Sequence, residues 1–70
     1  MILSEEVMDN AIRDYYETYC NPSAEDVFLG KPACNVWLFS RGNIRISLHC
    51  HIISGKVTRT DYEKGEKPGG

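Results

Sequence analysis

The stretch NIRISLHCHI, residues 43–52, decides the fold, because it is the most regular part of this 70-residue chain. Apolar and polar side chains alternate along it, and a period of two residues is typical of a β-strand with one buried face. The apolar set is Ile44, Ile46, Leu48, Cys50 and Ile52. The alternate set includes Arg45, His49 and His51, so we expect this second set to face away from the core.

Two further runs on either side of this stretch have the same strand-like composition. ACNVWLFS at 33–40 precedes it and KVTRTDY at 56–62 follows it. The dipeptides Arg41–Gly42 and Ser54–Gly55 separate the runs and are typical of turns. The sequence therefore predicts a three-stranded antiparallel meander.

The N-terminal residues carry the signals of an amphipathic helix. Ser4 is a favourable N-cap, and two glutamates follow it in the first turn, where the helix dipole favours negative charge. Apolar residues then recur every three to four positions. Because Pro22 disfavours helical geometry in the residue before it, we expect the helix to end near Tyr19 or Cys20.

The segment SAEDVFLG, residues 23–30, predicts a short second helical turn. Ser23 can cap it, Asp26 lies at the capping-box distance and Gly30 is placed to end it. We therefore predict an α+β fold in the order α-β-β-β, with the helix and this turn packed on the meander. A compact domain would span 1–62, and the charged, Gly-rich residues 63–70 predict a disordered tail.

The orientation of the first strand depends on the length of the loop that follows it. A three-residue loop ending at Gly42 pairs Leu38 with Ile44 and turns Trp37 and Phe39 outward. A two-residue loop ending at the same glycine turns the two aromatic side chains inward. Glycine at the last loop position favours the first register.

The second hairpin completes the expected outer face. A two-residue Ser54–Gly55 loop pairs Ile52 with Val57, and this register places the second strand's histidines beside outward residues of the third. Exposed aromatic and arginine side chains are enriched in protein-binding sites. The candidate sheet-face site is Trp37, Phe39, Arg45, His49, His51 and Tyr62.

Length and composition argue against an enzyme. A chain of 70 residues has a thin core with little room for a substrate pocket, and a homodimer would extend that core. Three cysteines without a CxxC pair suggest neither a disulfide framework nor a zinc site. We find no signal peptide and no apolar run long enough to span a bilayer, so we expect a cytoplasmic protein without a cofactor or a membrane partner.

The charge is divided between the two halves of the chain. Residues 1–30 contain seven acidic residues and one arginine, a net charge of −6, whereas residues 31–70 have a net charge of +4. The expected acidic helix face, a second candidate binding surface, consists of Glu6, Asp9, Asp14 and Glu17. Such a face can attract a basic partner by electrostatic complementarity.

Three functional hypotheses follow from these patterns. We favour a small non-enzymatic protein-binding module, an inhibitor or regulator of a nucleic-acid-handling protein complex of the kind found in phages and mobile elements. The first alternative is direct nucleic-acid binding, with bases stacked on the aromatic sheet face. The second is metal binding by His49 and His51, whose side chains point to the same side of a strand but lack an evident third ligand.

Overall fold

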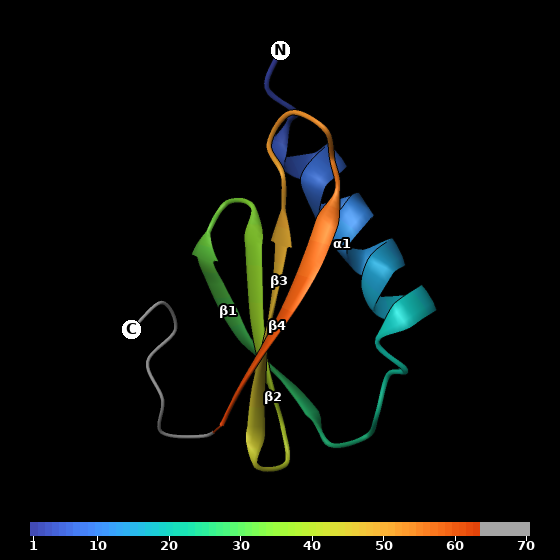
Figure 1. Ribbon diagram of the computed structural model, residues 1–70, viewed down its shortest axis with the longest axis vertical. Coiled ribbons are helices and arrows are strands. Elements are labelled where there is room, and N and C mark those ends of the chain that lie inside the picture. The colour runs from blue at the N-terminus through green and yellow to red at the C-terminus, as the bar shows by residue number, and fades with distance from the viewer. Residues whose placement is uncertain (64–70) are drawn as a thin grey trace.

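A computed structural model describes residues 1–63 of the chain as one helix and four strands. Helix α1 spans Glu5–Tyr19, and the strands span Asp26–Ala33 (β1), Val36–Arg41 (β2), Ile44–Cys50 (β3) and Val57–Glu63 (β4). The strands form one antiparallel sheet in sequence order, with β1 and β4 at its edges (Figure 1). The predicted α+β class is confirmed, but the sheet has four strands rather than three.

Helix α1 begins and ends where the sequence predicts. The Ser4 hydroxyl accepts a hydrogen bond from the Val7 backbone N–H at 3.2 Å, which satisfies one free donor of the first turn. At the other end Asn21 has a left-handed φ of 51°, and this conformation turns the chain away just before Pro22. Within residues 1–63, α1 is neither long nor apolar enough to cross a membrane.

The predicted helical turn over 23–30 is wrong, because strand β1 begins at Asp26. One of the two capping-box contacts forms, since the Ser23 N–H donates to the Asp26 carboxylate at 3.0 Å. The Asp26 N–H instead donates to the Ser23 backbone carbonyl at 3.0 Å, and the Ser23 hydroxyl accepts from the Glu25 N–H. These contacts close a turn that leads into the strand. Pairing with β2 then gives the following backbone hydrogen-bond partners along the strand, despite register shifts on both sides of Gly30, whereas a single helical turn leaves most of its hydrogen-bonding groups without partners.

The hairpin between β2 and β3 has a different register from the favoured one. Its loop is Gly42–Asn43, and it pairs Phe39 with Ile46 and Trp37 with Leu48. The glycine, with a φ of 56°, is therefore the first of two central residues, where a type II′ turn requires it. The prediction that Trp37 and Phe39 face outward is wrong, because both lie on the helix side of the sheet with the apolar residues of β3.

The hairpin between β3 and β4 is shifted by two residues from the predicted register. Cys50, rather than Ile52, is opposite Val57, and residues 51–56 form the loop. A shift of two residues preserves the side on which each side chain lies. Arg45, His49 and Tyr62 therefore lie on the face away from α1, as the sequence predicts.

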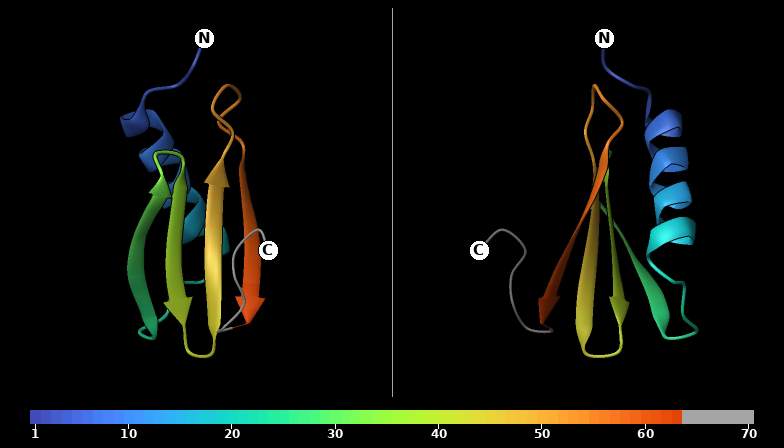
Figure 2. Two further views of the ribbon diagram at one scale, coloured as in Figure 1. Left: turned by 90° about the vertical axis from the view of Figure 1, so that its left-hand side faces the viewer. Right: turned by 45° about the vertical axis from the view of Figure 1, so that its right-hand side comes forward.

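Helix α1 covers one face of the sheet and packs mainly on β3 and β4 (Figure 2). We call the opposite side, which no other element among residues 1–63 covers, the open face. The hydrophobic core lies between α1 and the sheet and consists of Met8, Ile12, Cys20, Phe39, Ile46, Leu48 and Cys50. The predicted tail, residues 63–70, lies outside the described residues apart from Glu63, the last residue of β4.

Candidate functional site

The structure divides the predicted sheet-face site among three places. Trp37 and Phe39 lie on the helix side of the sheet, where Phe39 is buried and Trp37 is half-buried. His51 lies in the β3–β4 loop. Arg45, His49 and Tyr62 remain together on the open face. The stacking platform on which the nucleic-acid hypothesis depended is therefore not a single surface.

The two histidines do not converge on a common point. The His49 Nε2 atom lies 2.9 Å from the Asn35 side-chain nitrogen, whereas His51 Nδ1 accepts hydrogen bonds from the backbone N–H groups of Ile53 and Ser54. The His51 side chain therefore stabilises the β3–β4 loop through hydrogen bonds with the backbone of that loop. Among residues 1–63 no three His, Cys, Asp or Glu side chains are grouped so that they could hold a metal ion.

The acidic helix residues also separate into two groups. Glu6, Asp14 and Glu17 are exposed, but Asp9 faces the sheet and is half-buried. Its carboxylate accepts a hydrogen bond from the Trp37 indole N–H at 3.0 Å and forms a salt bridge with Lys31 at 2.9 Å. These contacts, the Trp37 hydrogen bond first, lower the pKa of Asp9. Asp9 therefore positions Trp37 rather than forming part of the exposed acidic face.

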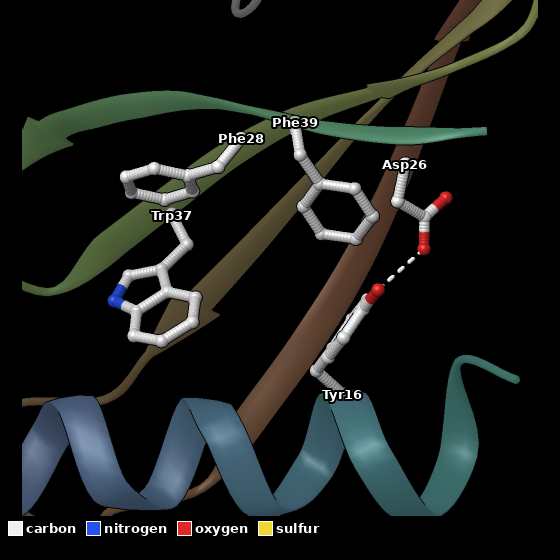
Figure 3. A pocket seen from close by; sticks show the side chains of 5 residues that line it. All are labelled: Tyr16, Asp26, Phe28, Trp37 and Phe39. Carbon is white, nitrogen blue, oxygen red and sulfur yellow. Dashed lines mark hydrogen bonds between the residues drawn. The ribbon is translucent and has the colours of Figure 1, made fainter. Parts of the chain in front are cut away.

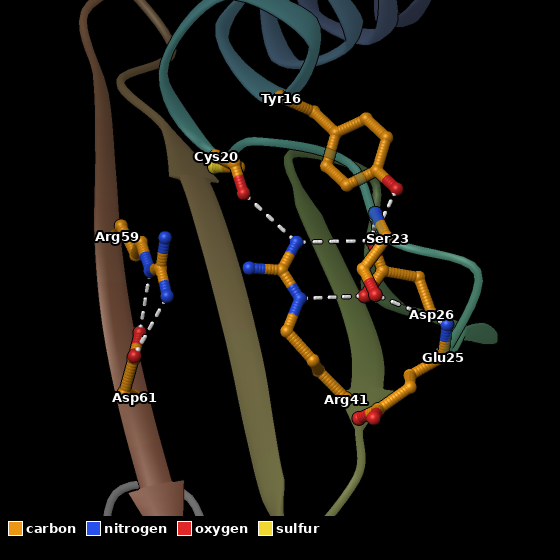
Figure 4. Close-up of polar contacts among 8 residues, drawn as sticks. All are labelled: Tyr16, Cys20, Ser23, Glu25, Asp26, Arg41, Arg59 and Asp61. Atoms are coloured by element: carbon orange, nitrogen blue, oxygen red, sulfur yellow. Dashed lines mark hydrogen bonds and ion pairs between the residues drawn. The ribbon is translucent and has the colours of Figure 1, made fainter.

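A polar cluster ties the end of α1 to the start of β1 and the end of β2 (Figure 4). The Asp26 carboxylate accepts hydrogen bonds from Arg41 Nε at 2.6 Å and from the Tyr16 hydroxyl at 2.5 Å. Arg41 Nη2 also donates to the Cys20 carbonyl at 2.8 Å, which leaves that helix-end carbonyl satisfied. We call these four residues the clasp.

The clasp fixes the protonation states of its members. Hydrogen bonds from Arg41, and then from Tyr16 and the Ser23 backbone, hold the pKa of Asp26 well below its usual range. The hydrogen bond to the Asp26 carboxylate raises the pKa of Tyr16 above its usual value, since deprotonation would place two negative charges together. Both pKa values are thus shifted away from neutral pH.

A pocket of about 200 Å³ opens between α1 and the β1–β2 half of the sheet (Figure 3). Four aromatic rings and one carboxylate line it. These residues, which we call the aromatic pocket, are Tyr16 from α1, Asp26 and Phe28 from β1, and Trp37 and Phe39 from β2.

Contacts among the lining residues, and one contact with Asp9 outside the pocket, hold its rings in place. The Tyr16 and Phe39 rings meet edge to face, with centroids 5.1 Å apart, and Phe28 meets Trp37 at 5.5 Å in a similar geometry. Asp9 fixes the Trp37 indole, and Asp26 fixes the Tyr16 hydroxyl. Each ring of the pocket therefore contacts at least one other side chain of the chain.

Beside the pocket, β1 presents an apolar edge. Val27, Phe28 and Leu29 are consecutive, and these residues are 56%, 57% and 47% exposed. Phe28 is paired with Phe39 and projects on the helix side, whereas Val27, paired with Ser40, projects toward the open face. A register shift between Phe28 and Gly30 interrupts this alternation at Leu29. Three adjacent exposed apolar residues at a sheet edge are unusual, since proteins normally protect such edges with charge.

The backbone of this edge is also partly free. The Cys50 N–H donates to the Asn35 carbonyl at 2.8 Å, so alternate residues of the β2 segment direct their backbone groups toward β3. Ser40, between two such residues, directs its groups toward its partner Val27. The N–H and C=O of the next residue, Phe28, therefore point to the outer edge of the sheet.

The sequence contained two signals that would have located this site. A Gly-Asn dipeptide between strand-like runs is typical of a two-residue hairpin, and this loop turns Trp37 inward. Val27–Phe28–Leu29 combines β-branched and aromatic residues, which favour a strand. The partnership of Asp26 with Arg41 carries no local signal, because 15 positions separate the two residues.

Comparison with known proteins found no matching family model, curated protein or solved structure.

Proposed function

We propose that this protein is a non-enzymatic module that binds a protein partner through one recognition surface. This surface consists of the exposed β1 edge, Val27–Leu29, and the adjoining aromatic pocket. The observation that supports this proposal most directly is the run of three exposed apolar residues on an edge strand. When a partner binds at an exposed sheet edge, an extended segment of the partner covers the edge strand, and the side chains of that segment enter neighbouring pockets.

The chemistry of the aromatic pocket favours binding over catalysis. General acid–base catalysis needs a group whose pKa lies near the working pH. The two titratable groups that line the pocket, Tyr16 and Asp26, have pKa values shifted away from neutrality in opposite directions. Each is held by the clasp, so the pocket offers apolar surface and fixed shape rather than proton transfer.

The exposed acidic residues of α1 support a basic partner. Glu6, Asp14 and Glu17 are solvent-exposed, and the first 30 residues carry a net charge of −6. A negative surface speeds the encounter with positively charged proteins. Proteins that handle nucleic acids commonly have basic surfaces, so inhibition or regulation of such a protein is the specific role that we propose.

Affinity capture from lysate of the source cells, with and without nuclease, tests this proposal. We expect a stoichiometric protein partner that survives nuclease treatment and is lost with Phe28→Glu, because this change places a charge in the apolar contact. Ile53→Glu is the matched control, since Ile53 is 59% exposed but lies in the β3–β4 loop. Capture that resists Phe28→Glu, or that disappears with nuclease, would contradict the proposal.

A further inference from the structure

We infer that the aromatic pocket binds an ammonium group, that of a lysine side chain or its N-methylated forms, presented by the partner. This inference rests on the proposed function, because the ammonium group would belong to the bound protein. The ammonium group would be the part of the partner that enters the aromatic pocket of the recognition surface.

The lining of the pocket is suited to a cation. Tyr16, Phe28, Trp37 and Phe39 surround it, and aromatic rings attract cations through the negative potential of their faces. The rings of Phe28 and Trp37 are inclined by 70°, and those of Tyr16 and Phe39 by 86°. Rings in several orientations enclose a compact, rounded group better than a planar guanidinium, which stacks on a single ring.

Trp37 already takes part in one such contact. The Arg13 guanidinium lies 5.8 Å from the centre of the Trp37 ring, within the usual range of a cation–π interaction. Arg13 is not among the residues that line the pocket. The indole ring that lines the pocket therefore already attracts a positive charge of this chain.

The charges around the pocket also favour a cation over an anion. Two neighbouring basic groups are already neutralised, because Arg41 pairs with Asp26, and Lys31 pairs with Asp9 and Glu5. Arg13, beside the Trp37 ring, forms no salt bridge within residues 1–63. Glu6, Asp14 and Glu17 remain exposed on α1, and none of them forms a salt bridge within residues 1–63. Their combined field attracts an approaching ammonium group.

Titration with small probes tests the inference, with the fluorescence of Trp37, the single tryptophan, as readout. Tetramethylammonium and neopentyl alcohol have nearly the same shape, but only the former is charged. We expect tetramethylammonium chloride to cause a saturable change that neopentyl alcohol matches only at concentrations at least tenfold higher, with sodium chloride holding the ionic strength constant. A parallel n-butylammonium titration shows whether the unmethylated group binds as well.

Phe28→Leu removes one ring from the pocket and keeps an exposed apolar residue on β1. We expect it to weaken tetramethylammonium binding about fivefold, since one cation–π contact contributes about 1 kcal/mol. Ile53→Val, in the distant loop, should leave the titration unchanged. Equal binding of the neutral and charged probes, or no saturable change with either, would overturn the inference.

The two proposals can fail separately. If neither ammonium probe binds but Phe28→Glu still abolishes capture of the partner, the ammonium inference is wrong and the recognition surface stands. If Phe28→Glu captures the partner equally well, the proposed recognition surface is wrong. There is then no bound partner that would present an ammonium group to the pocket.

Discussion

The two edges of the sheet are built in opposite ways. Strand β4 alternates threonines with charged residues, and Arg59 and Asp61 on its helix side form a bidentate salt bridge at 2.7 and 2.8 Å. Strand β1 instead exposes Val27, Phe28 and Leu29. Charge keeps an edge from pairing with other chains, whereas an apolar edge invites contact. The β4 edge is therefore suited to contact with water, and the apolar β1 edge is the one for which we propose a partner.

The salt bridges at the two edges differ in how far they are exposed to solvent. Asp26, at the start of β1, has a side chain only 8% exposed, whereas the Asp61 side chain on β4 is 42% exposed. Asp26 joins three segments of the chain through the clasp, but Asp61 contacts a residue of its own strand. The apolar edge is therefore anchored by buried polar contacts, which hold β1 in place without covering it.

The largest expected effect is on stability. Asp26→Ala leaves Arg41 and the Tyr16 hydroxyl without their partner in a largely buried place, so we expect a loss of about 3 kcal/mol in the free energy of unfolding. Asp61→Ala should cost at most about 1 kcal/mol, because that pair is partly exposed. Urea denaturation of both variants measures the difference. Similar losses would show that the two edges are anchored alike.

A second, smaller effect concerns acid. The folded-state pKa of Asp26 lies below its unfolded value, so its stabilising contribution is complete above the unfolded pKa of about 3.9. It is lost as the pH falls below that value toward the folded pKa. We expect the unfolding free energy to decline from about pH 4 to pH 2, and less steeply in Asp26→Asn.

Asp61→Asn is the control for the acid experiment. The pKa of Asp61 is also lowered, chiefly by its hydrogen bonds with Arg59, but the more exposed carboxylate is coupled less strongly to folding. Its acid profile should stay closer to that of the unmodified protein. If Asp26→Asn leaves the slope unchanged, the clasp is not the acid-sensitive contact.

The smallest expected effect is that of charging the β1 edge itself. Val27→Lys replaces an exposed side chain, and we expect it to change the free energy of unfolding by no more than about 0.5 kcal/mol. Thr58→Lys on β4 should behave in the same way. A much larger loss in Val27→Lys, measured by thermal unfolding, would mean that the apolar edge serves folding rather than binding.

The parts of the fold with strong local signals could be predicted from the sequence. The Ser4 cap and Pro22 set the ends of α1, and the alternation over 44–50 identifies β3. The error at β1 has a physical cause, because the contacts between Ser23 and Asp26 are compatible with either a helix or a turn. Only pairing with the distant strand β2 decides between them.

The candidate site was harder to predict because it depends on a register. One residue of difference in the loop at Gly42 moves Trp37 from one face of the sheet to the other. The aromatic pocket then requires Tyr16, Phe28 and Trp37 to meet, and they come from three separate elements. No short sequence pattern predicts that these three side chains line one pocket. The exposed acidic residues, by contrast, depend only on helical periodicity, and all but Asp9 are exposed as expected.

The most direct test of the contrast between the edges is a map of amide chemical shifts in the ¹⁵N-labelled protein, recorded with and without its captured partner. The account predicts the largest changes at residues 26–29 and at the Trp37 indole N–H, with little change along β4. Changes confined to residues 57–63, or to the open-face residues Arg45 and His49, would contradict it.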